Sequence, residues 1–325
     1  MPGIDRTTII QGPALVAYGG QTFWSKGDVT VTPMLKRFAV ETSAFGKLED
    51  RNIDLRIDVT FEPAGQFTTA LAAVLWPYAG SAPGTALYGA TDVPLVVWGR
   101  AGDKLTLANA ALTQMPNVRF GVAKTTLGQI KFTGLVANSS DPSTLASYWA
   151  WASAGYPGDT GFSTDTIWTR KPISAWGITS PWDAFETEAG WEISFPMQTA
   201  DVAVDGIGTV GMRLVSVAAS AVCIPVGPTA AQVLTALHGG LAMGVSPAKT
   251  TLSVSAGASG SPILTMAASL AAADTRWGAT AKRVGQCTWT AVRTFSEYVP
   301  AVVSPAAPAV EAAMLPLFTI AEVPA

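Results

Sequence analysis

The 325-residue sequence has few charged residues and a single histidine. Asp, Glu, Lys and Arg make up 13% of it, about half of the ~25% that is usual in soluble domains, and 49% is apolar. A surface so poor in charge indicates a protein covered by copies of itself or by partners, and an ordinary Ala/Gly/Thr-rich β protein is the alternative. The net charge of −3, with no Lys/Arg cluster, argues against a nucleic-acid-binding surface, because such a surface must neutralise phosphates.

Long apolar runs and a cysteine framework are also missing. No run reaches the ~18 uninterrupted apolar residues of a membrane helix, so no membrane span is expected. The first residues contain no apolar core of signal-peptide length, which makes export by that route unexpected. Cys223 and Cys287 could form a single pair, but Cys223 lies in an apolar run, which favours a buried free thiol.

Catalytic motifs fail on their context. His238 has no Cys or carboxylate cluster near it in sequence, which favours a packing role. The run from Gly206 to Gly211 matches G-x-G-x-x-G, but a strand-like segment follows it where a helix is needed, so we expect a hairpin loop. Asp54 and Asp58 are separated by Arg56 on one strand face, which is typical of a charge ladder. We expect no enzyme activity, no metal and no cofactor.

The clearest positive signal is the stretch from residue 46 to residue 75. Its middle alternates, which predicts a β-strand with one buried and one solvated face. Pro63 and Gly65 end the strand, and QFTTALAAVL then has the spacing of a short amphipathic helix. The buried positions are Ile53, Leu55, Ile57, Val59 and Phe61, and the solvated ones are Asp54, Arg56, Asp58, Thr60 and Glu62.

The landmarks of this half recur in the second half at offsets of 157 to 163. The most specific shared pattern is R-aromatic-G-x6-G-Q-x2-aromatic-T, which begins at Arg119 and again at Arg276. Pro33-Met34 matches Pro196-Met197 at 163, whereas Pro63 and Gly65 match Pro225 and Gly227 at 162. Repeats of this kind usually mean copies of one structural unit that pack against each other.

The sequence therefore predicts a mainly β protein with two tandem copies of one sandwich- or barrel-like domain, each with a short flanking α-helix. The copies span residues 1–136 and 167–299. The segment 137–166 is a linker or insertion, and 300–325 is an Ala/Pro-rich arm expected to run over another surface. The aromatic residues of the linker either pack back onto a domain or meet a neighbouring subunit; they include Tyr148, Trp149, Trp151 and Tyr156.

The two copies differ on the solvated face of the central strand. At an offset of 162, the charged ladder of the first copy becomes Ser216, Ala218 and Ser220 in the second. The apolar face is kept, as a core requires. The face that varies is therefore the first candidate for a functional surface.

Together, these tandem β domains, the P-x-G break before a short helix, the late R-aromatic-G hairpin and the absence of a catalytic cluster resemble the tail tube (major tail) proteins of long-tailed bacteriophages. The resemblance implies a virion protein, made in the host cytoplasm, that forms rings stacked into a hollow tube through which DNA is ejected. A two-domain chain would form homotrimeric pseudo-hexamers. Tape measure and tail terminator proteins would be further partners.

A neutral or acidic inner wall lets a polyanion slide without sticking. We therefore expect Asp54, Arg56 and Asp58, with Ser216, Ala218 and Ser220, on a solvated lumen-side face. Contacts between rings are expected from the loops at 39–47, 80–84 and 204–211. The alternative function is a receptor- or carbohydrate-binding β module that uses the aromatic linker as its platform.

Overall fold

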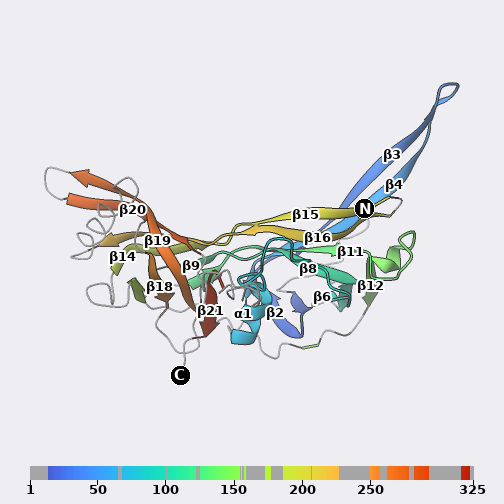
Figure 1. The fold of residues 1–325 in the computed structure, drawn as a ribbon. Coiled ribbons are helices and arrows are strands. Elements are labelled where there is room, and N and C mark those ends of the chain that lie inside the picture. Colours follow the sequence, from blue (N-terminus) through green and yellow to red (C-terminus); the bar gives the residue numbers. More distant parts are fainter. Residues whose placement is uncertain are drawn as a thin grey trace, which may run out of the picture.

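The computed structural model has a mainly β fold, as the sequence predicts (Figure 1). It describes residues 14–64, 68–99, 102–121, 125–153, 155, 157–158, 173–176, 186–205, 207–226, 249–256, 262–277, 282–292 and 316–322. Within those ranges, no helix has the length and apolar character that a membrane span needs. We call residues 14–153 the first half and residues 173–292 the second half.

The first half consists mainly of two sheets that face each other across an aromatic core. Phe61 stacks against Phe23 on one side and Phe132 on the other, with ring centroids 5.8 and 6.2 Å apart. One sheet has the order β12-β7-β6-β1-β2-β5, and the other has the order β3-β4-β11-β8. Their strands are β1 (Leu15–Tyr18), β2 (Gln21–Ser25), β3 (Thr30–Thr42), β4 (Gly46–Phe61), β5 (Pro63–Ala64), β6 (Leu95–Trp98), β7 (Asp103–Leu107), β8 (Asn109–Gln114), β11 (Ile130–Leu135) and β12 (Trp149–Ser153).

The largest sheet belongs mostly to the second half and has the order β10-β9-β14-β17-β20-β19-β18-β13, with β21 also paired to β19. A separate two-stranded hairpin, β15–β16, runs along the first half (Figure 1). The strands are β9 (Val118–Phe120), β10 (Thr125–Leu127), β13 (Ile173–Trp176), β14 (Glu186–Ser194), β15 (Met197–Val204), β16 (Gly208–Val217), β17 (Ser220–Val226), β18 (Lys249–Ser255), β19 (Pro262–Trp277), β20 (Lys282–Ala291) and β21 (Thr319–Glu322).

The predicted short helix exists, as α1 (Thr69–Leu75). It begins where the Thr68 hydroxyl accepts a hydrogen bond from the backbone N–H of Leu71 at 3.1 Å, which is an N-cap. It buries Leu71, Ala72 and Leu75 against the core. Its expected counterpart in the second half lies outside the described residues, as does His238.

Strand β4 buries the expected face only in part. Ile57, Val59 and Phe61 are at most 2% exposed, but Ile53 is 41% exposed, so its predicted burial is wrong. The reason is that β3 and β4 continue beyond their sheet as a projecting hairpin, whose residues 34–55 we call the arm (Figure 1). The loop expected at 39–47 is thus mostly strand, at the tip of this arm.

The two halves repeat the same strand pairings. In the first half, Thr30 pairs with Thr60 and Thr42 with Gly46; in the second, Glu192 pairs with Val222 and Val204 with Gly208. Each of these residues differs from its counterpart by 162. Both hairpins also have two register shifts at equivalent places, after Lys36 and Val40 and after Gln198 and Val202. These registers support the predicted duplication, which remains an inference.

The repeated registers also correct one detail of the sequence alignment. An offset of 162 holds throughout this region, so Pro33 is equivalent to Phe195, and the Pro33–Pro196 match at 163 is out of register by one residue. Gly46 and Gly208 are equivalent and both have positive φ, of 70° and 88°. Such a backbone favours glycine at both hairpin tips.

The C-terminal segment crosses from one half to the other. Strand β21 pairs with β19 of the second half, whereas the Leu317 N–H donates to the Ala79 carbonyl of the first half at 2.8 Å. The Phe318 ring lies 4.4 Å from that of Phe195 and is 1% exposed. The expected surface arm therefore packs, in its described part, on the chain's own two halves.

Candidate assembly surface

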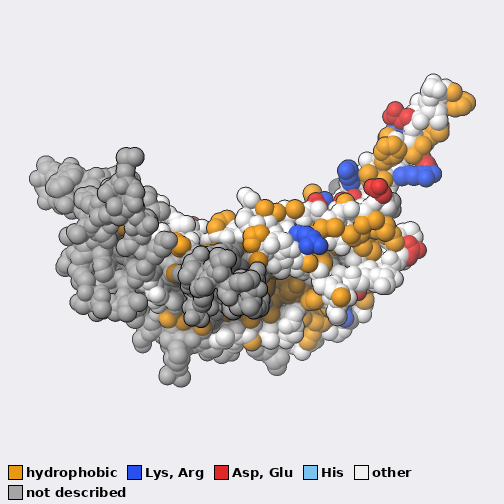
Figure 2. All heavy atoms as spheres, viewed as in Figure 1, with side chains coloured by type: hydrophobic (Ala, Val, Ile, Leu, Met, Phe, Trp, Pro, Cys, Tyr) orange, Lys and Arg blue, Asp and Glu red, His pale blue; other side chains and the backbone are white. Residues whose placement is uncertain are grey.

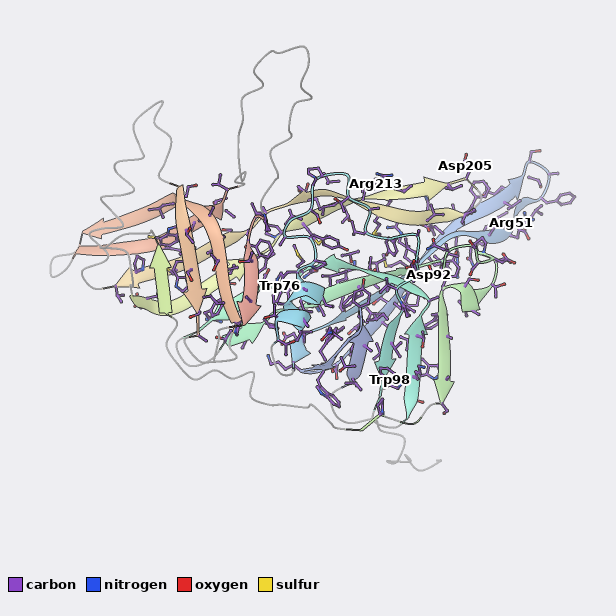
Figure 3. The ribbon with its side chains drawn as sticks, turned by 60° about the horizontal axis from the view of Figure 1, so that its bottom comes forward. Arg51, Trp76, Asp92, Trp98, Asp205 and Arg213 are labelled. Atoms are coloured by element: carbon purple, nitrogen blue, oxygen red, sulfur yellow. The ribbon has the colours of Figure 1, made fainter. Side chains whose placement is uncertain are left out.

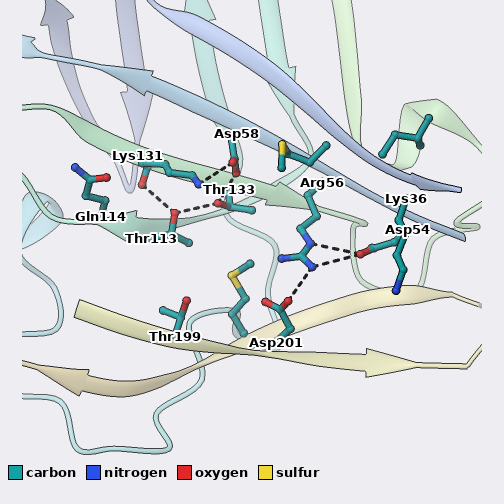
Figure 4. Close-up of a pocket in the computed structure, with 13 residues that line it drawn as sticks. Lys36, Asp54, Arg56, Asp58, Thr113, Gln114, Lys131, Thr133, Thr199 and Asp201 are labelled. Atoms are coloured by element: carbon teal, nitrogen blue, oxygen red, sulfur yellow. Dashed lines mark hydrogen bonds and ion pairs between the residues drawn. The ribbon is translucent and has the colours of Figure 1, made fainter. Parts of the chain in front are cut away.

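A polar pocket lies where the β15–β16 hairpin of the second half crosses the sheet of the first half (Figure 4). Its volume is about 530 Å³. Charged side chains of both signs line it from β3, β4, β11 and β15: Lys36, Asp54, Arg56, Asp58, Lys131 and Asp201. Three carboxylates thus face three cations.

Arg56 is the side chain that joins the halves in this pocket. Its Nη2 lies 2.8 Å from Asp201 Oδ2 of the covering hairpin and 3.4 Å from Asp54 Oδ2 of its own strand. Asp54 in turn accepts hydrogen bonds from the backbone N–H and hydroxyl of Thr209, at 3.0 and 3.1 Å. The tip of the β15–β16 hairpin is therefore held on β4 by charge-assisted hydrogen bonds.

Asp58 belongs to a second network, inside the first half. It lies 2.7 Å from Lys131 Nζ and accepts a hydrogen bond from the Thr133 hydroxyl at 2.8 Å. The Thr133 carbonyl accepts from the Tyr88 hydroxyl. Burial, and to a lesser extent nearby charges including Asp58, raises the pKa of Tyr88 well above its usual value. Each carboxylate of the pocket has a partner, so the site has the chemistry of a contact and not of an acid/base pair.

The structure brings Asp54, Arg56 and Asp58 together on one polar face of β4, which lines the pocket and is partly covered; that this face lies toward a lumen stays a prediction. Their side chains are 14%, 29% and 15% exposed. The β15–β16 hairpin contacts Asp54 and Arg56, whereas the partners of Asp58 lie on β11. The pattern of a single strand could not show this cover, which comes from residues about 150 positions away. The described residues 207–211 of the G-x-G-x-x-G run lie at the tip of this hairpin and in the start of β16, so a strand follows the run as the sequence predicts.

The equivalent residues of the second half lie apart from this pocket. Ser216 and Ala218 are exposed, and Ser220 is half-buried at the start of β17. In the described part of the chain, no hairpin covers Ser216 and Ala218 as β15–β16 covers Asp54 and Arg56. The same face is thus covered in one half and open in the other.

In its described part, the aromatic linker packs back onto the first half, one of the two predicted alternatives. Strand β12 pairs with β7, with Trp149 opposite Leu107 and Trp151 opposite Leu105. Tyr148 is 5% exposed, so its ring contributes to the core and is not available to a neighbouring subunit. Trp149 is half-buried, Trp151 is 64% exposed, and Tyr156 lies outside the described residues. An inter-subunit role remains a prediction for Trp151.

The arm exposes an apolar surface in the isolated chain (Figure 2). Phe45 at its tip is 81% exposed, and five further large apolar side chains of the arm are at least 40% exposed: Met34, Leu35, Phe38, Leu48 and Ile53. Large apolar side chains exposed together on one element are typical of an interaction site. The sequence gives little hint of it, because alternation alone assigns Ile53 to a core.

A second contact between the halves is a shared sheet. Strand β9 of the first half pairs with β14 of the second, with Val118, Arg119 and Phe120 opposite Ile193, Glu192 and Trp191. Gly190 permits the approach, since a Cβ there would come within 1.9 Å of the Phe120 carbonyl oxygen. The R-aromatic-G motif predicted a hairpin, but not that the hairpin joins the other half.

Arg213 and Arg51, which are equivalent at an offset of 162, show how differently the two hairpins are placed (Figure 3). Arg213 donates from Nη1 to the Gly84 carbonyl at 3.1 Å. Its backbone also forms an isolated antiparallel β-bridge with Ala86. Arg51 lies on the arm, 71% exposed, and pairs with Glu49 of its own strand. One hairpin is docked, and the other projects.

In the described part of the chain, no group of three or more His, Cys, Asp or Glu side chains is placed to hold a metal ion. Cys223 is a buried free thiol, as predicted, and Cys287 is likewise. Comparison of the chain with known protein-family models and with curated proteins finds no match.

Proposed function

We propose that this chain is a structural protein that assembles with copies of itself into stacked rings, forming the tail tube of a long-tailed bacteriophage. The observation that carries the proposal is the apolar arm, which projects from one half while the equivalent hairpin of the other half is docked. In such a chain, the β15–β16 hairpin docks within the chain, whereas the equivalent hairpin, the arm, projects. The arm can make the equivalent contact with another copy of the chain.

The β-rich composition of the halves fits the same proposal. A free β domain must protect its edge strands, and closing domains edge to edge in a ring removes the edges. The chain already joins its halves in this manner, through β9 and β14. The proposed partners are therefore other copies of the chain first, and then tape measure and terminator proteins.

The passage of DNA agrees with the charge of the chain. The net charge is −3, and Arg56 and Lys131 of the polar pocket are each paired with a carboxylate. A wall without unpaired clusters of Lys and Arg releases few counterions, and so binds DNA weakly. Asp54, Arg56 and Asp58 line the partly covered pocket, and their place on the inner wall stays a prediction.

Electron microscopy of the purified full-length chain over a range of concentrations tests the proposal. Rings or tubes with a hollow centre are the expected result, together with a mass that rises with concentration in light scattering. Discrete particles that stay monomeric at high concentration would contradict the proposal. If those particles bound a glycan array, the receptor-binding alternative would replace it.

A further inference from the structure

We propose that a second copy of this chain binds head to tail, with its first half docked on the second half of this chain as the chain's own second half is docked on its first. The inference rests on the proposed self-assembly and names the contact surfaces. Its basis is that both elements of the internal contact have counterparts elsewhere in the chain that, among the described strands, do not make the equivalent contact.

The first element is the shared sheet. The β9–β10 hairpin pairs Phe120 with Thr125 and Arg119 with Thr126, and the far end of β19–β20 repeats this with Trp277–Lys282 and Arg276–Arg283, at an offset of 157. The strand that β9 pairs with is repeated as well, because residues 191–193 of β14 are equivalent to residues 29–31. Among the described strands, β3 pairs with β4 alone and is an edge strand.

Applying the internal register to these open edges gives three pairs between copies. Val29 lies opposite Trp277, Thr30 opposite Arg276, and Val31 opposite Thr275 of the other copy. Strand β3 suits this role, since its edge in the isolated chain leaves backbone N–H and C=O groups ready for pairing with another strand. Pro33 follows directly and limits the pairing to this short stretch.

The second element is the covering hairpin. Gly208 at the tip of β15–β16 is so close to β4 that a Cβ would lie 2.6 Å from the Ile53 carbonyl oxygen, whereas a Cβ on the equivalent Gly46 would meet nothing within 4 Å. The surface equivalent to Ile53 and Asp54 is Val215 and Ser216, and both are exposed. The arm of one copy therefore lies over Val215 and Ser216 of the other.

The chemistry of the two contacts keeps them distinct. Inside the chain, Asp201 of the covering hairpin pairs with Arg56 at 2.8 Å. Their equivalents at an offset of 162 are Ala39 on the arm and Ala218 on the open face, which makes a small apolar contact between copies. A docking error that exchanged the two hairpins would leave Arg56 or Asp201 facing alanine without its partner, at a cost in desolvation. The halves must therefore alternate along the assembly.

Cysteine pairs test the register. Thr30→Cys and Arg276→Cys are made as separate full-length variants, which are mixed, concentrated to the assembled state and oxidised. The expected product is a covalent dimer at twice the mass of the chain, because paired strand residues have Cα atoms close enough for a disulfide. The double variant is expected to give a ladder of multimers.

Two controls give the experiment its resolution. Arg119→Cys with Glu192→Cys in one chain reproduces the internal pair and must form an intramolecular disulfide, which shows that the geometry is competent. The second control mixes Thr144→Cys with Arg276→Cys. Thr144 is exposed and lies outside both elements, so this mixture must give no covalent dimer. If the internal control closes but no Thr30–Arg276 dimer forms in assembled protein, the head-to-tail contact is overturned.

A charge exchange provides a second readout. Ala39→Asp alone is expected to abolish assembly, and adding Ala218→Arg is expected to restore it by recreating the pair that Asp201 and Arg56 make. Failure of the rescue, with both variants folded, contradicts the arm contact. Tubes that form without the Thr30–Arg276 cross-link would support the proposed function and overturn the head-to-tail contact. Cross-linked chains that never form hollow rings would support the head-to-tail contact and contradict the proposed function.

Discussion

At the scale of single residues, Asp54 carries much of the contact between the halves. Its carboxylate accepts two hydrogen bonds from Thr209 and is 14% exposed. We expect Asp54→Ala to lower the free energy of unfolding by about 1–3 kcal/mol, because the donors of the hairpin tip lose their acceptor. Urea denaturation measures this change, and hydrogen exchange at the Thr209 amide is expected to speed up.

Asp50→Ala is the matched control, since Asp50 lies on the arm and pairs only with Lys47 there. It is expected to change the stability of the monomer by no more than about 0.5 kcal/mol, as for other surface substitutions. An Asp54→Ala variant that is as stable as the Asp50→Ala variant would show that the pocket contributes nothing to the contact.

The equivalent glycines at the two hairpin tips allow a comparison in which the backbone strain is nearly the same. Both have positive φ, so alanine costs about 1–2 kcal/mol at either position. Only Gly208→Ala adds a clash, with the Ile53 carbonyl oxygen. In monomer, Gly208→Ala is expected to be clearly the more destabilising of the two by thermal melting. Equal losses of melting temperature in Gly208→Ala and Gly46→Ala would mean that the tip of β15–β16 does not contact β4 closely.

At the scale of elements, the arm is expected to serve assembly and not folding. Replacing Phe38, Phe45 and Leu48 by serine removes its most exposed large side chains. The melting temperature of the monomer is expected to stay within about 2 °C, since none of the three is in the core. Self-association, followed by light scattering, is expected to be lost.

Leu145→Ser is the control for the arm, because Leu145 is 57% exposed but lies outside it. It is expected to leave both melting and self-association unchanged. An arm variant that still forms large particles would remove the basis for the arm contact. An arm variant that unfolds would show instead that the arm contributes to the stability of the monomer.

The elements also show how far sequence reasoning reaches. Alternation located β4, helical spacing located α1, and the burial of Ile57, Val59 and Phe61 followed from the period of a strand. The pocket could not be predicted, because Asp54 and Asp201 are brought together by the packing of two halves whose relative placement leaves no periodic trace. The exposure of Ile53 could not be predicted either, because alternation defines a face of the strand and does not show that the strand continues beyond its sheet.

At the scale of the whole molecule, the C-terminal segment couples the two halves. Phe318 is buried against Phe195, and Leu317 is bonded to the first half while β21 extends the sheet of the second. We expect Phe318→Ala to cost about 3–5 kcal/mol, because it leaves a cavity at a junction. Calorimetry is expected to show one unfolding transition for the native chain and two for the variant.

Thr319→Ala provides the control, since Thr319 belongs to the same strand but is exposed. It is expected to keep the single transition and nearly the same midpoint. Two transitions in the native chain, or one in Phe318→Ala, would mean that the coupling of the halves lies elsewhere.

Strand β9 belongs to the first half in sequence but pairs within the sheet of the second half in space. During synthesis, Val118 and Phe120 must therefore wait without their partner strand until the ribosome has made at least residues 191–193. The boundary between the halves is consequently not a place where the protein can be divided. A chain severed between residues 153 and 173 should stay together as two interlocked fragments, and neither piece expressed alone should be well folded.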